Sequence, residues 1–139
     1  MKALFLWIGW MLWSTLSDVK SQPMPEKAVV MLYREREFAS LSYTIFVNGK
    51  RVSALSTNRF IRLEVPAGKV VIDAKQNYLT KPRSVYFGAE PGKLYYIKAV
   101  EDVHIVGRSL LLGFVREAQA RRDLTRIKPM EPETENELP

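Results

Sequence analysis

The chain has no cysteine and only one histidine, His104, among its 139 residues. It therefore forms no disulfide, no thiolate metal site and no thiol nucleophile, and no lipid is attached through cysteine. A single imidazole with scattered carboxylates does not supply a convergent set of metal ligands. Glycine is also scarce, and its seven residues never cluster into a phosphate-binding loop. We therefore expect no metal and no other cofactor.

The surroundings of His104 offer the one arrangement from which a hydrolytic site can be imagined. Glu101 and Asp102 precede it, and Ser109 follows a few residues later. However, a histidine beside two carboxylates at a strand end is typical of a solvated loop, and the sequence has neither a nucleophile elbow nor an evident oxyanion hole. We expect a protein that is not an enzyme and keep a hydrolase around His104 as the lesser alternative.

The length and composition, with 47% hydrophobic and 26% charged residues, fit one globular domain behind an export segment. Lys2 precedes an apolar stretch over residues 3–16, which is short for a membrane span and typical of a signal peptide. We favour a signal peptide over residues 1–21, followed by an extended segment over residues 22–27. The alternative is an uncleaved anchor in the inner membrane, to which the interfacial tryptophans Trp7, Trp10 and Trp13 would contribute. The expected location is periplasmic or secreted.

Three glycine–lysine corners predict an all-β fold: Asn48-Gly49-Lys50, Ala67-Gly68-Lys69 and Pro91-Gly92-Lys93. Glycine permits the backbone reversal, and the flanking runs are rich in β-branched and aromatic residues. We expect residues 28–128 to form a small antiparallel β-sandwich, immunoglobulin-like or transthyretin-like, of about seven strands.

Apolar runs and alternation locate the strands. Residues 28–33 should form a central strand covered on both faces, after which Arg34-Glu35-Arg36-Glu37 should enter solvent. Three hairpins are expected, pairing residues 41–47 with 51–55, residues 59–65 with 69–75, and residues 83–87 with 94–100, while residues 76–82 cross between the sheets. A closing strand over residues 110–115 should precede a helix over residues 116–127, and residues 129–139 form an acidic, disordered tail.

The ordered strings YTIFVNGK (residues 43–50), FIRLEVPAGK (60–69) and PGKLYY (91–96) resemble a family of uncharacterised bacterial envelope proteins that carry a domain of unknown function. The resemblance covers residues 28–124; similar corners also occur in transthyretin-like and PEGA-type domains. Members of the family are usually exported and often lipoproteins. Because this chain lacks the cysteine of a lipoprotein, the resemblance implies export without a lipid anchor, and it brings no catalytic residues.

Positive charge is the sequence feature that most directly suggests partners. The net charge is +6, and the tail holds four glutamates, so the folded body is more positive than the whole chain. The candidate anion-binding residues are Arg116, Arg121, Arg122, Arg126 and Lys128. For an exported protein the anionic partners are lipid phosphates, lipopolysaccharide, acidic glycans and wall polymers rather than nucleic acid. The alternative is a solvated helix face, partly neutralised by neighbouring acids and the tail.

A candidate recognition loop lies between two strands. Most tyrosines are expected to pack in the sandwich, whereas Tyr78 lies in the segment 76–82 beside Lys75, Lys81 and Arg83. Together these features predict a non-catalytic envelope domain that binds a protein or an anionic polymer. The alternative is a purely structural module that assembles with itself, and membrane contact is expected only through an uncleaved N-terminal segment.

Overall fold

The computed structural model describes residues 26–38, 41–76, 82–105 and 107–130. Its elements are β1 (Lys27–Arg34), β2 (Tyr43–Val47), β3 (Lys50–Leu55), β4 (Arg59–Pro66), β5 (Gly68–Lys75), β6 (Arg83–Ala89), β7 (Leu94–His104), β8 (Gly107–Phe114), α1 (Glu117–Leu124) and β9 (Lys128–Pro129). The all-β class is confirmed, and the described ranges contain nine strands where about seven were expected. The expected export segment and residues 131–139 lie outside these ranges, whereas Pro129 belongs to β9.

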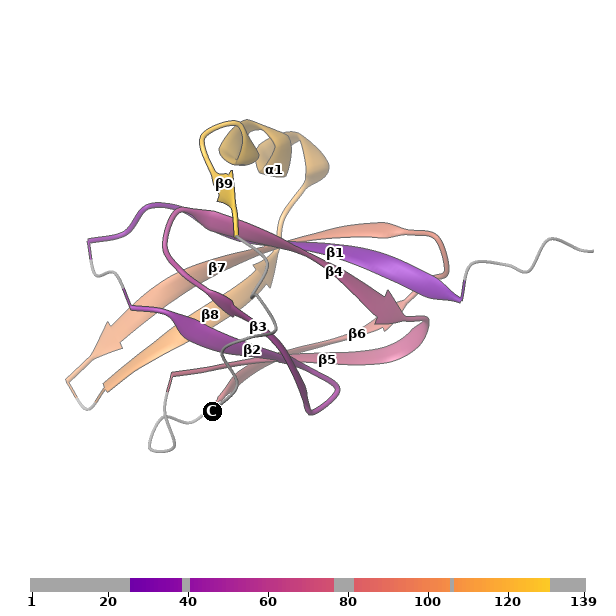
Figure 1. Cartoon of the computed structure of the whole chain (residues 1–139), viewed down its shortest axis with the longest axis horizontal. Helices are drawn as coiled ribbons and strands as arrows, with labels where there is room; N and C mark the ends of the chain where they lie inside the picture. Colours follow the sequence, from indigo (N-terminus) through magenta and orange to yellow (C-terminus); the bar gives the residue numbers. More distant parts are fainter. Residues whose placement is uncertain (1–25, 39–40, 77–81, 106, 131–139) are drawn as a thin grey trace, which may run out of the picture.

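The strands form two sheets that face each other, as Figure 1 shows. The five-stranded sheet has the order β8-β7-β1-β4-β9, and the four-stranded sheet has the order β3-β2-β5-β6. All neighbours are antiparallel except the parallel pairs β1–β7 and β4–β9. Apolar side chains from both inner faces make one core, which includes Val30, Leu32, Ile45, Leu63, Ile72, Ile97 and Leu110. Burial of this apolar surface is the main stabilising contribution to the fold.

The hairpin between β2 and β3 is the most secure sequence prediction, and it is confirmed. Asn48 and Gly49 have φ values of 49° and 82°, the positive values that a two-residue type I′ turn requires. The Oδ1 atom of Asn48 also accepts a hydrogen bond of 2.9 Å from the backbone N–H of Val71 in β5. The turn is therefore fixed both by its own backbone geometry and by the adjacent strand.

The predicted faces of the later strands are also confirmed. The core side of β4 carries Ile61, Leu63 and Val65, that of β5 carries Val70, Ile72 and Ala74, and that of β7 carries Ile97 and Ala99. Their neighbours Arg62 and Glu64 face solvent. This period of two is what a strand with one buried face requires.

The other two predicted hairpins are wrong. β4 pairs with β1 and β5 pairs with β2, so the corner at Ala67 and Gly68 carries the chain from one sheet to the other. Likewise β6 pairs with β5, whereas β7 pairs with β1 and β8. The prediction that residues 76–82 cross between the sheets is also wrong, because this connection joins β5 and β6, which are neighbours in the same sheet. The chain changes sheet instead at the connections 35–42 and 56–58 and at the corners Ala67-Gly68 and Pro91-Gly92.

The prediction of solvent exposure fails for Arg34, the last residue of the central strand β1. Its side chain is fully buried, and its Nη2 atom lies 2.8 Å from Glu37 Oε2 and 2.9 Å from Glu101 Oε2. The guanidinium also donates to the carbonyl of Leu41 and lies 5.3 Å from the ring centre of Tyr43. Opposite charges and hydrogen bonds thus satisfy a cation that would otherwise be very costly to bury. The contacts to Glu37 and Leu41 hold the β1–β2 connection against the sandwich.

One end of the sandwich collects four connections. The register places the ends of β1, β3, β5 and β7 and the beginnings of β2, β4, β6 and β8 at this end, at the left of Figure 1. The connections are residues 35–42, 56–58, 76–82 and 105–106. We call this the loop end. In β-sandwiches such loops are positioned by the sheets but remain free to contact a ligand.

The helix α1 packs on the outer face of the five-stranded sheet, as expected for a short helix after the closing strand (Figure 1). It is shorter than the predicted range 116–127. Ala120 and Ile127 are buried against Tyr33 of β1 in a small second cluster that Phe60 and Leu124 complete. This cluster covers only the last part of β1, because Val29 and Met31 on the same face are half-buried. The helix therefore lies near the loop end.

Candidate functional site

A cavity of about 380 Å³ opens at the loop end, where α1 meets the sheet. Its lining residues are Glu35, Arg36, Asn58, Asp123, Arg126 and Ile127, which we call the loop-end pocket. They come from the segment after β1, the turn before β4 and the end of α1. Three segments that are distant in sequence thus converge on one polar site, a common arrangement for a binding pocket.

Asp123 forms the inner wall of this pocket. Its Oδ2 atom accepts a hydrogen bond of 2.7 Å from the hydroxyl of Tyr33 and lies 3.7 Å from Lys98 Nζ. Lys98 Nζ is also 3.1 Å from Glu35 Oε1. Although burial opposes ionisation, the Tyr33 hydrogen bond and the charges of Lys98 and Arg126 keep the pKa of Asp123 below its usual range. The carboxylate is therefore ionised and held in place.

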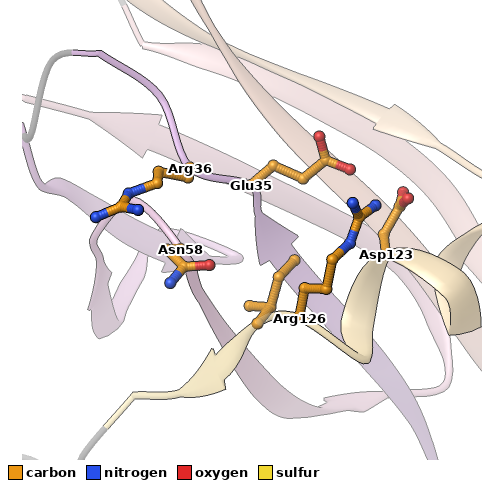
Figure 2. Close-up of a pocket in the computed structure, with 6 residues that line it drawn as sticks. Glu35, Arg36, Asn58, Asp123 and Arg126 are labelled. Carbon is orange, nitrogen blue, oxygen red and sulfur yellow. The ribbon is translucent and has the colours of Figure 1, made fainter.

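The positive groups of the pocket lie on two sides. Figure 2 shows the guanidinium of Arg126 directed toward Glu35 and Asp123, whereas Arg36 extends to the opposite side, past Asn58. Arg36 makes no ion pair within the described ranges. The lining itself carries two cations and two carboxylates, and Lys98, which contacts both carboxylates without lining the pocket, adds a third positive charge beside it. This excess favours an anionic ligand.

Asn58 adds a polar, uncharged group between the two guanidiniums. It has a φ of 56°, a left-handed conformation that asparagine tolerates better than most residues. Its backbone N–H bonds to the carbonyl of Glu35 at 3.3 Å, and its carbonyl accepts the N–H of Lys128 at 3.4 Å. The backbone is thus anchored on both sides, and the carboxamide lines the pocket, where it is able to donate to an anion.

The structure separates the predicted anion-binding residues into two groups. Arg126 enters the loop-end pocket, and Lys128 follows directly in β9. Arg116, Arg121 and Arg122 are exposed on or beside α1, and Arg121 pairs with Glu117 at 2.6 Å. The prediction missed Arg36 and Asn58, because nothing in their local sequence indicates that they meet Arg126. Asn58 followed by Arg59 after a strand indicates a turn, and a turn alone does not indicate a binding site.

The candidate recognition loop is described only at its two ends. Tyr78 and Lys81 lie outside the described residues, while Lys75 ends β5 and Arg83 begins β6. The register pairs Arg83 with Ala74, so Lys75 and Arg83 lie at the loop end, on the opposite sheet from the pocket. Among the described tyrosines Tyr86 has the most exposed side chain, at 74%, an exposure that the sequence did not indicate.

His104 lies at the tip of the β7–β8 hairpin with 51% of its side chain exposed. Its Nε2 atom is 2.6 Å from Asp102 Oδ2. Ser109 is opposite Asp102 in the register, but its buried hydroxyl has no hydrogen-bond partner within the described ranges, and so it is not activated by His104. These positions do not assemble a nucleophile with its base.

A second, apolar surface lies along β7 and β8. Leu111 and Val100 are opposite each other on the outer face, 41% and 44% exposed, and β8 is the edge strand of its sheet. A shallow hollow of about 280 Å³ lies between them and Val115. Gly113 forms part of its lining, and a Cβ added there would have no atom within 4 Å. Exposed apolar patches of this kind often mark contacts with other proteins.

Neither a metal site nor a membrane-spanning helix is found in the described part of the chain. No group of three or more potential ligands gathers there, and no helix there is long and apolar enough to cross a membrane. No protein-family model matches the chain, and no curated protein or solved structure is similar to it. The resemblance to uncharacterised envelope proteins therefore stays a prediction.

Proposed function

We propose that this protein is a non-catalytic binding domain of the cell envelope that holds an anionic group of a protein, polymer or lipid in the loop-end pocket. The observation that carries the proposal is that Arg36, Asn58 and Arg126 line one pocket, beside which Lys98 adds a third positive charge. Two guanidiniums and a carboxamide are well suited to phosphate or carboxylate oxygens. The exposure of His104, together with a Ser109 hydroxyl that makes no hydrogen bond within the described ranges, supports binding rather than catalysis.

The rigid inner wall supports the same proposal. Tyr33 and Lys98 fix Asp123 and Glu35, so these carboxylates need not rearrange when a ligand enters. A preorganised site loses less conformational entropy on binding than a flexible one. The fixed carboxylates also repel an anion from the inner wall, and this favours recognition of one terminal anionic group on the Arg36 side over deep insertion of a polyanion.

The test compares two sources of phosphate, inorganic polyphosphate and vesicles containing phosphatidylglycerol, by titration at low and high salt. We expect Arg36→Gln with Arg126→Gln to weaken binding at least tenfold, since two charge-assisted contacts are lost. The matched control is Arg62→Gln, which removes an exposed arginine outside the pocket. Equal losses in both variants would mean that binding follows overall charge and not the pocket.

Localisation is proposed from the sequence. The apolar N-terminal segment favours export with cleavage after Ser21, into the periplasm or the medium. The intact mass of the protein from its host, with fractionation of the same sample, tests this. A mass that begins at Gln22 in a soluble envelope fraction supports it, whereas a full-length mass in the membrane fraction identifies the segment as an anchor.

The exposed β7–β8 surface favours a second candidate function, self-assembly through the edge of the five-stranded sheet. β8 has no charged residue between Arg108 and Arg116, whereas edge strands usually carry charges that prevent such pairing. Sedimentation over a range of concentrations tests this, and Leu111→Lys should abolish any association.

The finer fold relation, immunoglobulin-like or transthyretin-like, is likewise a proposal that rests on the two-sheet arrangement.

A further inference from the structure

The acidic end of the chain begins beside the loop-end pocket. The N–H of Lys128 bonds to the carbonyl of the pocket residue Asn58 at 3.4 Å, and the N–H of Met130 bonds to the carbonyl of Phe60 at 2.9 Å. Met130 also packs against the main core, so the chain is held in place to this point. The nine residues 131–139 that follow lie outside the described ranges.

The sequence places a proline, Pro132, two residues after Met130. In the parallel ladder, the N–H groups of Lys128 and Met130 bond to Asn58 and Phe60, so every second N–H is used. The next donor in this series would be residue 132, opposite Arg62. Proline has no N–H, so residue 132 cannot supply that donor.

The charges after Met130 match those of the pocket. Residues 131–139 read EPETENELP, with Glu131, Glu133, Glu135 and Glu137 at alternate positions and no basic residue. In an extended chain, alternate residues project to the same side, about 7 Å apart. Such a row of carboxylates resembles a short anionic polymer, the ligand class proposed for the pocket.

The segment after Met130 is also long enough to reach the loop-end pocket. Three to five extended residues reach roughly 10 to 17 Å, so Glu133 and Glu135 can return to a pocket whose wall is bonded to Lys128. A tethered segment of this length has an effective local concentration on the order of millimolar. It therefore competes with a weakly bound external anion without needing high intrinsic affinity.

We infer that the acidic segment 131–139 is an internal competitor that occupies the Arg36 side of the loop-end pocket and must be displaced by an external anionic ligand. The inference rests on the proposed function for what the segment competes with, but contact between the segment and the pocket is measurable by itself. Raised salt weakens both the internal and the external contact, because the charges are near the surface.

Because the chain lacks cysteine, one spin label can be placed by Leu138→Cys and its effect on backbone amide NMR signals measured. We expect strong signal loss at Asn58, Arg126 and Ile127. The loss should vanish when the four glutamates are changed to glutamine and persist in the control Thr134→Ala with Asn136→Ala. Signal loss that is weak everywhere and the same in the glutamine variant would overturn the inference.

The second measurement is polyphosphate affinity, which should rise roughly fivefold when the four glutamates are neutralised. The two proposals fail in different ways. If the label reports contact at the pocket but polyphosphate and anionic vesicles do not bind, the inference stands and the proposed function fails. If polyphosphate binds in the pocket but neutral and acidic tails give the same affinity and no local signal loss, the proposed function stands and the inference fails.

Discussion

The hydroxyl of Tyr33 donates a hydrogen bond of 2.7 Å to Asp123 Oδ2, joining two residues that are 90 positions apart in the sequence. Tyr33 belongs to the central strand β1, and Asp123 lies near the end of α1. This bond fixes the helix to the sheet and orients the inner wall of the loop-end pocket. The position of the candidate site therefore depends on a contact between β1 and α1, the two elements of the site that are furthest apart in the sequence.

Tyr33→Phe should lower the free energy of unfolding by about 1–3 kcal/mol, because Asp123 loses its buried donor. Urea unfolding followed by circular dichroism measures the change. The matched control is Tyr86→Phe, which removes a hydroxyl from an exposed side chain and should change stability by less than about 0.5 kcal/mol. An equal effect of both substitutions would show that the Tyr33 hydroxyl does not secure the helix.

The protein should lose stability in alkaline solution. Burial and the hydrogen bond to Asp123 raise the pKa of Tyr33 above its ordinary value, and burial with the charge of Glu101 raises the pKa of Tyr43 to about 12. Since the unfolded chain releases these protons near pH 10, the folded state gains stability below that pH and loses it as the pH rises further.

Absorbance of tyrosinate against pH, with circular dichroism on the same samples, checks this. Tyr33 and Tyr43 should ionise only together with unfolding. If all tyrosines ionise before the fold is lost, these two hydroxyls are not protected in the manner described.

Arg34→Ala should be among the most destabilising substitutions, at about 3–5 kcal/mol, because Glu101 is only 4% exposed and loses its closest cation. Arg62→Ala removes the exposed pair with Glu64 and should cost less than about 1 kcal/mol. Chemical denaturation of both variants measures the difference. A small effect at Arg34 would mean that Arg108, which lies 3.4 Å from Glu101, is enough to stabilise this carboxylate.

Gly49→Ala should destabilise the β2–β3 hairpin by roughly 1–2 kcal/mol, since φ at this position is 82°. Gly113→Ala is the matched comparison, because its added Cβ meets open space and no positive φ is recorded there. We expect a change within about 0.5 kcal/mol at Gly113. Thermal unfolding of the two variants shows whether the loss of stability comes from the positive φ at Gly49 or from the replacement of a glycine by alanine as such.

Local sequence patterns predicted the strands and their faces because alternation and turn residues act over a few positions. They did not predict which sheet each strand joins. Asn48-Gly49 makes a true hairpin, whereas the corner at Ala67-Gly68 leads from β4 in one sheet to β5 in the other. Both corners reverse the chain direction and both need positive φ at glycine, so their local chemistry is the same.

The candidate site shows the same limit. Arg126 stood out within a basic segment, but Arg36 and Asn58 have no local signal that connects them with it. They meet because β4 lies beside β1 and because β9 returns to pair with β4, contacts between residues far apart in sequence. Arg34 was placed in solvent for a related reason: Glu37 lies only three residues away, but the second glutamate that stabilises its burial, Glu101, comes from the neighbouring strand β7.

The central claim is that the loop-end pocket binds an anionic group, and NMR titration of the isotope-labelled protein with inorganic polyphosphate tests it most directly. We predict that the largest shifts occur at the backbone or side-chain signals of Arg36, Asn58, Arg126 and Ile127, and that they saturate. Shifts that are spread over all exposed arginines without saturation, or that centre on the β7–β8 surface, would contradict the claim.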